Sequence, residues 1–504
     1  MADQIRDIVQ TFSEEEKREF RLFINRQRAK KNRIDLQLFE LFCEIKEYKP
    51  AQILTQLTPV TNFNAYHSNR KRLLKHLMDF VMVKRMDDDA TSASRIMALI
   101  ALAQYLFEHR KKNAAWTYLF KAEDLAKKND QFDLLDNIYN LQIQNAVDDL
   151  SPPLDDILAK WKVNKKLADE DERAEIAASI IKIKLAEFKS SMVKMDIHGF
   201  VVKTLKEYNL EDAIIERPRM LFRFMSMIRG LVLATKEYYD FEALIINQYE
   251  KVNTEIGFEK KDHFYKLNLL YMISHVLYRN RKFDESLTYL QQFKENIYLY
   301  KKSYFNTFYP KYILLFAAIK SYQGENEISI ELLKNTLEEN HSLGTKQRLN
   351  MNLNLAVYYF QSEEFKKSNQ VLLLLGHTDN WLKKTMGAEW LARKNLIEII
   401  TQFELGNVDI VENRIRSFKK QHALLMKLKA YKRIQTFIGF IEDCISRPDW
   451  VASDDYENHV NNTVNRLPLQ REDILAIAFY CWLKSKMVKK PYYEVLVEVV
   501  NEKG

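Results

Sequence analysis

The amino-acid sequence predicts an all-α protein, and three features of the chain support that prediction. Only 10 of the 504 residues are glycine, whereas tight β-hairpins depend on glycine where the backbone angle φ is positive. Apolar residues recur at helical spacing along nearly the whole chain, and nine prolines separate the helical stretches. No segment alternates convincingly between apolar and polar residues, apart from short ambiguous runs such as 495–500. We therefore expect helices throughout.

Residues 1–90 are predicted to form a compact N-terminal helical module. Apolar residues recur at helical spacing in three stretches, and three aspartates at 87–89 follow the last of them. These aspartates are expected to form a linker to the next part of the chain. The apolar stripes contain Phe20, Phe23 and Ile24, then Leu38, Phe39, Leu41 and Phe42, and finally Leu73, Leu74, Leu77 and Val81.

Residues 91–460 are predicted to form an array of antiparallel helix pairs, because small residues recur there at fixed offsets. A small residue on each helix lets two helices cross closely, and a bulky residue further along fills the groove of the next pair. Each pair buries only part of its apolar surface, so the pairs must stack. The offsets occur around Ala103 and Ala115, Ser274 and Ser286, Ala317 and Ser329, Ala356 and Ser368, and, as a poorer copy, Gly406 and Val411.

These offsets resemble tetratricopeptide repeats, which place large and small residues in one helix and alanine in the next. The chain departs from that family in three ways: the anchors Ser286, Ser329, Ser368 and Val411 are 43, 39 and 43 residues apart rather than ~34, and the tryptophan and the proline of the motif are missing. The resemblance implies a right-handed superhelix that binds a partner in a concave groove. It assigns no site residue.

The remaining segments are also predicted to be helical. Residues 126–260 show no regular repeat, and residues 461–504 contain a helix around 472–488 and a further apolar run after Pro491. Because a repeat array needs a terminal unit with a polar outer face, residues 461–504 are predicted to form a C-terminal cap.

The sequence contains no recognisable catalytic, cofactor or metal motif. The first glycine is Gly199, so no glycine-rich nucleotide loop precedes it, and the ten histidines form no HxxH, HxxxH or HExxH pair. The three cysteines, Cys43, Cys444 and Cys481, are widely separated, which fits a reducing cytoplasm better than a disulfide framework. No apolar run is long enough to span a bilayer, and the N-terminus lacks a secretory signal. We expect a cytoplasmic protein without cofactor, metal or membrane partner.

Two clusters of cations are candidate partner-binding sites. Residues 1–86 contain 17 Lys and Arg against 11 Asp and Glu, and their cations could contact phosphates or simply solvate helix ends. Residues 411–435 contain eight Lys and Arg against one Glu, and they could face the groove or form the wet outer face of a helix. The candidate residues are Arg70, Arg72 and Lys75 in the first cluster, and Arg414, Arg416, Lys419, Lys420 and Lys427 in the second.

An aromatic run at 298–312 is a third candidate. It contains seven aromatic residues interleaved with Lys301, Lys302 and Lys311, and such a pattern could stack bases or hold a peptide. Tyr304, Phe308 and Tyr312 recur every four residues, however, which favours packing in a core. Tyr304 and Tyr309 are the candidate contact residues.

The leading functional hypothesis is a non-catalytic scaffold or adaptor that binds an acidic or extended protein segment in a preformed groove. The alternative is a nucleic-acid-binding or regulatory protein, in which the basic N-terminal module contacts phosphates and the repeats sense a ligand. An enzyme whose site has no recognisable motif would instead show an enclosed pocket with convergent polar groups.

Overall fold

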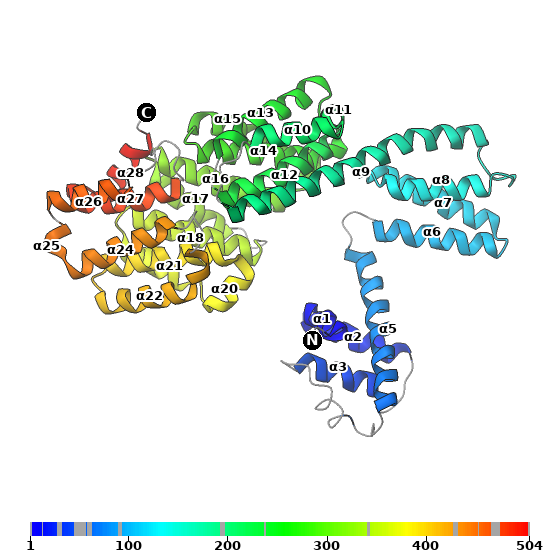
Figure 1. The fold of residues 1–504 in the computed structure, drawn as a ribbon, viewed down its shortest axis with the longest axis horizontal. Coiled ribbons are helices and arrows are strands. Elements are labelled where there is room, and N and C mark those ends of the chain that lie inside the picture. The colour runs from blue at the N-terminus through cyan, green and yellow to red at the C-terminus, as the bar shows by residue number, and fades with distance from the viewer. Residues whose placement is uncertain are drawn as a thin grey trace. The chain divides into compact units, whose positions relative to one another are not determined.

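The computed structural model describes residues 3–12, 14–27, 33–44, 57, 63–88, 93–191, 197–235, 238–339, 343–426, 432–451, 453–464 and 474–501. Every regular element in these ranges is a helix, and no strand occurs among them (Figure 1). The predicted all-α class is therefore confirmed, and the ambiguous run at 495–500 is helical.

Contacts within the chain divide it into two compact units, residues 1–171 and residues 172–504. The long helix α9, Leu154–Ser191, contributes to both units. Among the described residues, the first unit contains two hydrophobic cores and the second unit contains one. The domain boundaries that the sequence predicts near residues 90 and 460 stay predictions.

In the first unit, one core lies among four helices near the N-terminus. Phe20, Phe39 and Leu73, one from each predicted stripe, are completely buried in this core, as expected for the apolar faces of amphipathic helices. The ring centroids of Phe20 and Phe39 are 4.6 Å apart. The helices are α1 (Gln4–Thr11), α2 (Glu14–Gln27), α3 (Ile34–Glu44) and α5 (Phe63–Asp88).

A second core of this unit contains the first predicted helix pair. Ala103 and Ala115 are both completely buried where the paired helices α6 and α7 meet, because neither side chain extends beyond a methyl group. Glu123 is also buried there, where it accepts hydrogen bonds from Lys127 at 2.5 Å and from Gln142 at 2.8 Å. The helices around this core are α6 (Ala93–Glu108), α7 (Lys112–Lys128), α8 (Phe132–Gln144) and the first part of α9.

The second unit is a stack of antiparallel helix pairs, as the sequence predicts for four segments. The first helices of the pairs contact one another in order and form a layer, and each second helix contacts the first helix of the next pair. We call α12, α14, α16, α18 and α21 the first-helix layer. Its helices are α12 (Pro218–Thr235), α14 (His263–Arg279), α16 (Phe305–Tyr322), α18 (Thr345–Gln361) and α21 (Ala388–Glu404). The second helices are α13 (Tyr238–Glu255), α15 (Phe283–Ile297), α17 (Asn326–Glu339), α19 (Phe365–Leu373) and α22 (Val408–Gln421).

A serine joins the two helices of three consecutive pairs in the same way. The hydroxyl of Ser286 donates to the main-chain oxygen of Ser274 at 2.7 Å, twelve residues earlier in the chain. Ser329 donates to Ala317 at 2.7 Å, and Ser368 donates to Ala356 at 2.8 Å. All three serines are completely buried. The anchors found by spacing are thus the points where the paired helices cross.

The turn inside each pair is also repeated. In four pairs the backbone has positive φ seven residues after the small residue of the first helix, and in the α21–α22 pair it has positive φ at Gly406, seven residues after Ile399. In all five turns the next N–H donates to the main-chain oxygen five residues before it. This is the Schellman ending of a helix, which glycine adopts without steric cost. The positive-φ residues are Arg110, Arg281, Gly324, Glu363 and Gly406.

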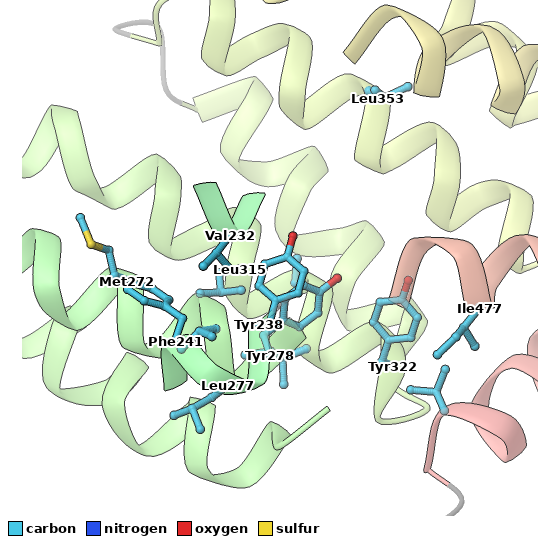
Figure 2. Close-up of a cluster of buried hydrophobic side chains, with 14 of the residues drawn as sticks. Val232, Tyr238, Phe241, Met272, Leu277, Tyr278, Leu315, Tyr322, Leu353 and Ile477 are labelled. Atoms are coloured by element: carbon cyan, nitrogen blue, oxygen red, sulfur yellow. The ribbon is translucent and has the colours of Figure 1, made fainter. Parts of the chain in front are cut away.

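The C-terminal helices fold back onto the first-helix layer. Trp482 Nε1 in α27 (Ile474–Val488) donates to Glu404 of α21 at 2.6 Å. In α28 (Tyr492–Asn501), the hydroxyl of Tyr493 donates to the main-chain oxygen of Ser321 at 2.5 Å. These contacts lie at the C-terminal ends of α16 and α21. Figure 2 shows Ile477 of α27 in the same buried cluster as Tyr278 and Tyr322.

Further helices lie in the remaining described parts of the second unit. They are α10 (Ile197–Glu207), α11 (Glu211–Glu216), η1 (Lys260–Asp262), η2 (Tyr300–Lys302), α20 (Asp379–Met386), α23 (Ala423–Met426), α24 (Lys432–Ser446), α25 (Pro448–Val451) and α26 (Asp454–Val464).

Candidate partner-binding surface

The cations predicted around α22 are partly engaged within the protein. Arg414 forms an ion pair with Glu398 of α21 at 2.7 Å, and Lys419 forms one with Glu442 of α24 at 2.5 Å. Arg416 donates to the neighbouring Asn413 at 2.9 Å. Arg416 and Lys420 are exposed. Because α22 is a second helix, these two cations do not belong to the first-helix layer.

Lys427 lies outside the described residues, as do residues 428–431. The structure therefore places only four of the five cations predicted for this site. Whether they bind a partner stays a prediction.

The cations predicted on α5 differ in their surroundings. Arg70 is partly buried, forms an ion pair with Asp3 at 2.6 Å, and lies 5.7 Å from the ring centroid of Phe42. Its guanidinium thus joins α5 to the start of α1. Arg72 and Lys75 are exposed on α5. Of these three candidates, only Arg72 and Lys75 have the exposed side chains that contact with a phosphate requires.

The aromatic run is mostly part of the core. Phe308 is completely buried and Tyr312 nearly so, while Tyr304 and Tyr309 are half-buried against them. Tyr309 stacks on Phe305, with the ring centroids 4.5 Å apart. The four-residue spacing of Tyr304, Phe308 and Tyr312 therefore predicted the packing of this run better than the alternation of aromatic residues and lysines did. The exposed part is the turn before α16, where Tyr298 and Tyr300 are 41% and 39% exposed.

A cluster that the sequence did not single out lies on the first-helix layer. The guanidinium carbon of Arg229 in α12 is 5.4 Å from the ring centroid of Tyr271 in α14. The ammonium of Lys311 in α16 is also 5.4 Å from this centroid, and it is 4.7 Å from the centroid of Phe308. All three polar side chains are half-buried. Three successive first helices thus bring two cations to one tyrosine.

The two cations of this cluster repel each other. Burial lowers the pKa of Lys311, and the nearby charge of Arg229 lowers it further. Among the described residues, no carboxylate forms an ion pair with Arg229 or Lys311. Contact with an aromatic face stabilises each cation, but it does not neutralise either charge. The cluster is therefore a half-buried positive centre.

Sequence reasoning missed this centre because its members are far apart in the chain. Arg229 lies in the region where no repeat was found, and Lys311 was counted only with the aromatic run. A usable signal was the position of each residue within its helix repeat, which we call the register. Lys311, Asn268 and Asn350 each lie six residues before the small residue of their helix, and Arg393 lies six residues before Ile399, at the equivalent position of α21.

The register residues make specific contacts across the layer. Asn350 Oδ1 accepts a hydrogen bond from Trp390 Nε1 at 2.8 Å, and Arg393 donates to Asn354 Oδ1 at 3.0 Å. Asn268 and Asn350 are half-buried, as Lys311 and Arg393 are. We call Asn268, Lys311, Asn350 and Arg393 the polar row. It extends over the four first helices α14, α16, α18 and α21.

Metal-ligating and nucleophilic side chains are the remaining candidate features of the described residues. No group of three or more histidine, cysteine or acidic side chains could hold a metal ion in the part of the chain that the structure describes. Burial raises the pKa of the Cys444 thiol to about 11, which opposes formation of a nucleophilic thiolate. Cys43, Cys444 and Cys481 form no disulfide with one another.

Within the same described ranges, none of the helices combines the length and the apolar character needed to cross a membrane. Comparison of the chain with protein-family models and with curated proteins gave no match.

Proposed function

We propose that the protein is a non-catalytic helical-repeat scaffold or adaptor that binds a protein or peptide partner on its first-helix layer. The paired helices then form a tetratricopeptide-like, right-handed superhelix in the cytoplasm, and the first-helix layer is its concave side. Residues 461–504 act as the C-terminal cap of the array. A preformed surface of this kind binds an extended segment without ordering a loop of its own, which lowers the entropic cost of binding.

The observation that carries the proposal is the half-buried positive centre of Arg229, Tyr271 and Lys311. Arg229 and Lys311 lie beside one ring and form no ion pair with any described carboxylate. Both cations can therefore still bind an anionic group of a partner. By contrast, Arg414 and Lys419 of α22 already form ion pairs. The support for a partner surface is therefore stronger on the first helices than on α22.

Photo-crosslinking in the cells that make the protein tests this proposal. A photoreactive phenylalanine analogue replaces Tyr271 on a first helix or, as the control, Tyr239 on the second helix α13. We expect one identified protein to crosslink from Tyr271 only, and the same protein, once purified, to bind the purified chain. Crosslinking of no protein from Tyr271, or equal crosslinking from both sites, would refute the proposal.

Nucleic-acid binding is a second candidate, because Lys71, Arg72 and Lys75 are exposed along α5. Affinity for a generic duplex DNA should then fall steeply between low and moderate salt. The double variant Arg72→Gln/Lys75→Gln should weaken this binding and flatten its salt dependence. Negligible binding at low salt would remove this candidate.

A further inference from the structure

We propose that the positive centre and the polar row form a binding site for an extended acidic peptide, with Arg229 and Lys311 contacting a peptide carboxylate. This inference rests on the proposed scaffold function, and it specifies the chemistry of the partner.

The charges of the centre favour an anion as the ligand. Arg229 and Lys311 approach the same ring, so that each cation raises the electrostatic energy of the other. A carboxylate placed between them would replace this repulsion by two attractions. Because both side chains are half-buried, water screens these interactions less than it screens charges at an open surface.

The alternation of groups in the polar row favours a peptide over a nucleic acid. Asn268 and Asn350 carry neutral amides, and they alternate with the cations Lys311 and Arg393. An amide both donates and accepts hydrogen bonds, which suits the main chain of an extended peptide. A nucleic-acid backbone instead presents a regular series of charges that lysine and arginine neutralise. In this row, every second register position holds a neutral side chain.

The row has the dimensions of a short peptide. Neighbouring helices lie about 8–10 Å apart, so four first helices extend over about 30 Å. An extended chain covers that distance with about ten residues. The C-terminal helices contact the far ends of α16 and α21, at Ser321 and Glu404. Lys311 and Arg393 lie near the other ends of these helices.

The test uses the intact protein and four fluorescent probes at low salt. One probe is an acetylated and amidated peptide of about ten residues with alternating Glu and Ala, and its matched control has Gln in place of Glu. The third probe is a single-stranded RNA of similar length. The peptide's blocked ends leave only side-chain carboxylates. The fourth probe is a peptide with its C-terminal carboxylate free and Gln at every Glu position, and it reports on binding through the terminus.

We expect the Glu peptide to bind and the Gln peptide not to bind. The double variant Arg229→Gln/Lys311→Gln should weaken binding of the Glu peptide at least about tenfold, because it removes charge-assisted hydrogen bonds. Arg416→Gln/Lys420→Gln on α22 removes the same charge and should leave the affinity within about twofold. Circular dichroism of both variants checks that they fold.

A second measurement uses the unaltered protein and does not depend on a variant. A carbodiimide activates the carboxylates of the Glu peptide, and an amide bond then forms with a nearby amine. Mass spectrometry should locate the crosslink at Lys311, whose lowered pKa leaves more of its amine deprotonated and nucleophilic.

Four results would overturn the inference: no binding of the Glu peptide, equal weakening by the α22 variant, tighter binding of the RNA, or binding of the free-terminus Gln peptide alone. Each leaves the scaffold proposal standing if one identified protein still crosslinks from Tyr271. Conversely, if the Glu peptide binds at Lys311 but Tyr271 crosslinks to no protein in cells, the scaffold function fails and the anion site remains.

Discussion

The hydroxyl of Ser329 donates a 2.7 Å hydrogen bond to the main-chain oxygen of Ala317, and this bond joins α17 to α16 where the two helices cross. Ser286 and Ser368 make the equivalent bonds in the neighbouring pairs. The serine side chain is thus small enough for the two helices to pack closely, and its hydroxyl forms a hydrogen bond with the backbone of the opposite helix.

Substitution of Ser329 should separate these two roles. We expect Ser329→Ala to lower the free energy of unfolding by about 1 kcal/mol, the usual contribution of one hydrogen bond. Ser329→Leu should cost more, about 1–3 kcal/mol or above, because the larger side chain overpacks the crossing. Ser446→Ala is the matched control, since Ser446 is exposed and bonds only within its own helix. Chemical denaturation measures all three, and an equal loss for Ser446→Ala would contradict the assignment.

Two glycine substitutions should have opposite effects on stability. Gly324 has a φ of +95° in the turn of the α16–α17 pair, and a Cβ there would meet no other atom within 4 Å. Gly324→Ala should therefore destabilise the fold by about 1–2 kcal/mol through the backbone alone. Gly230 lies inside α12, also with free space for a Cβ. Gly230→Ala should stabilise it by up to about 1 kcal/mol. Thermal unfolding measures both, and the same sign for both would be contrary to this expectation.

Glu404 should hold the C-terminal helices on the first-helix layer. Its carboxylate accepts hydrogen bonds from Trp482 Nε1 at 2.6 Å and from Lys486 at 2.7 Å. Glu404→Ala leaves both donors without this acceptor, so we expect a loss of about 1–3 kcal/mol. Hydrogen exchange should accelerate in α27 and α28 before it does in α14. Glu498→Ala, which removes an exposed pair with Lys490, is the control. Unchanged exchange in α27 would show that Glu404 does not hold the helices.

Acid should weaken the N-terminal helices through His76. Burial lowers the pKa of His76, although Asp35 lies 3.5 Å from its Nε2 and acts in the opposite direction. The folded state therefore binds this proton less readily than the unfolded state does. The free energy of unfolding should therefore be highest above the ordinary pKa of histidine. It should decrease as the pH falls through that pKa. Relative to the intrinsic exchange rate at each pH, the protection of amides in α3 and α5 should decrease between about pH 7.5 and about pH 5.5, and less so in His76→Gln. An equal loss of protection in that variant would rule out His76 as the cause.

The ion pair of Asp35 with Arg33 gives a further expectation in the same core. Arg33 contacts both oxygens of Asp35, at 3.0 and 2.7 Å, and both side chains are at most 10% exposed. Asp35→Ala would leave a buried guanidinium without this partner and should cost about 3 kcal/mol. Glu40→Ala, which breaks the more exposed pair with Arg21, should cost less than about 1 kcal/mol. Denaturation of the core of α1 to α5, followed by hydrogen exchange, measures both.

Much of the architecture could be predicted because it depends on short-range patterns. The spacing of Ser286, Ser329 and Ser368 located three helix crossings, and the periodicity around Phe308 and Tyr312 identified buried positions. The pair of α12 and α13 was missed, because residues 126–260 show no regular repeat of small residues at fixed offsets. The same pattern could not tell whether a cation such as Arg70 is engaged, since its partner Asp3 lies 67 residues away.

The sequence by itself determined the all-α class and the helix pairs that carry small residues at fixed offsets, because these follow from side-chain size and periodicity within about forty residues. Only the tertiary structure decided which charges remain without an ion pair and where the C-terminal helices lie. Arg229 and Lys311 meet at Tyr271 because stacking brings three first helices together, and Tyr493 reaches Ser321 across 172 residues. The physical reason is that electrostatic and hydrogen-bond energies depend on distance in space, which the chain acquires only when its pairs stack.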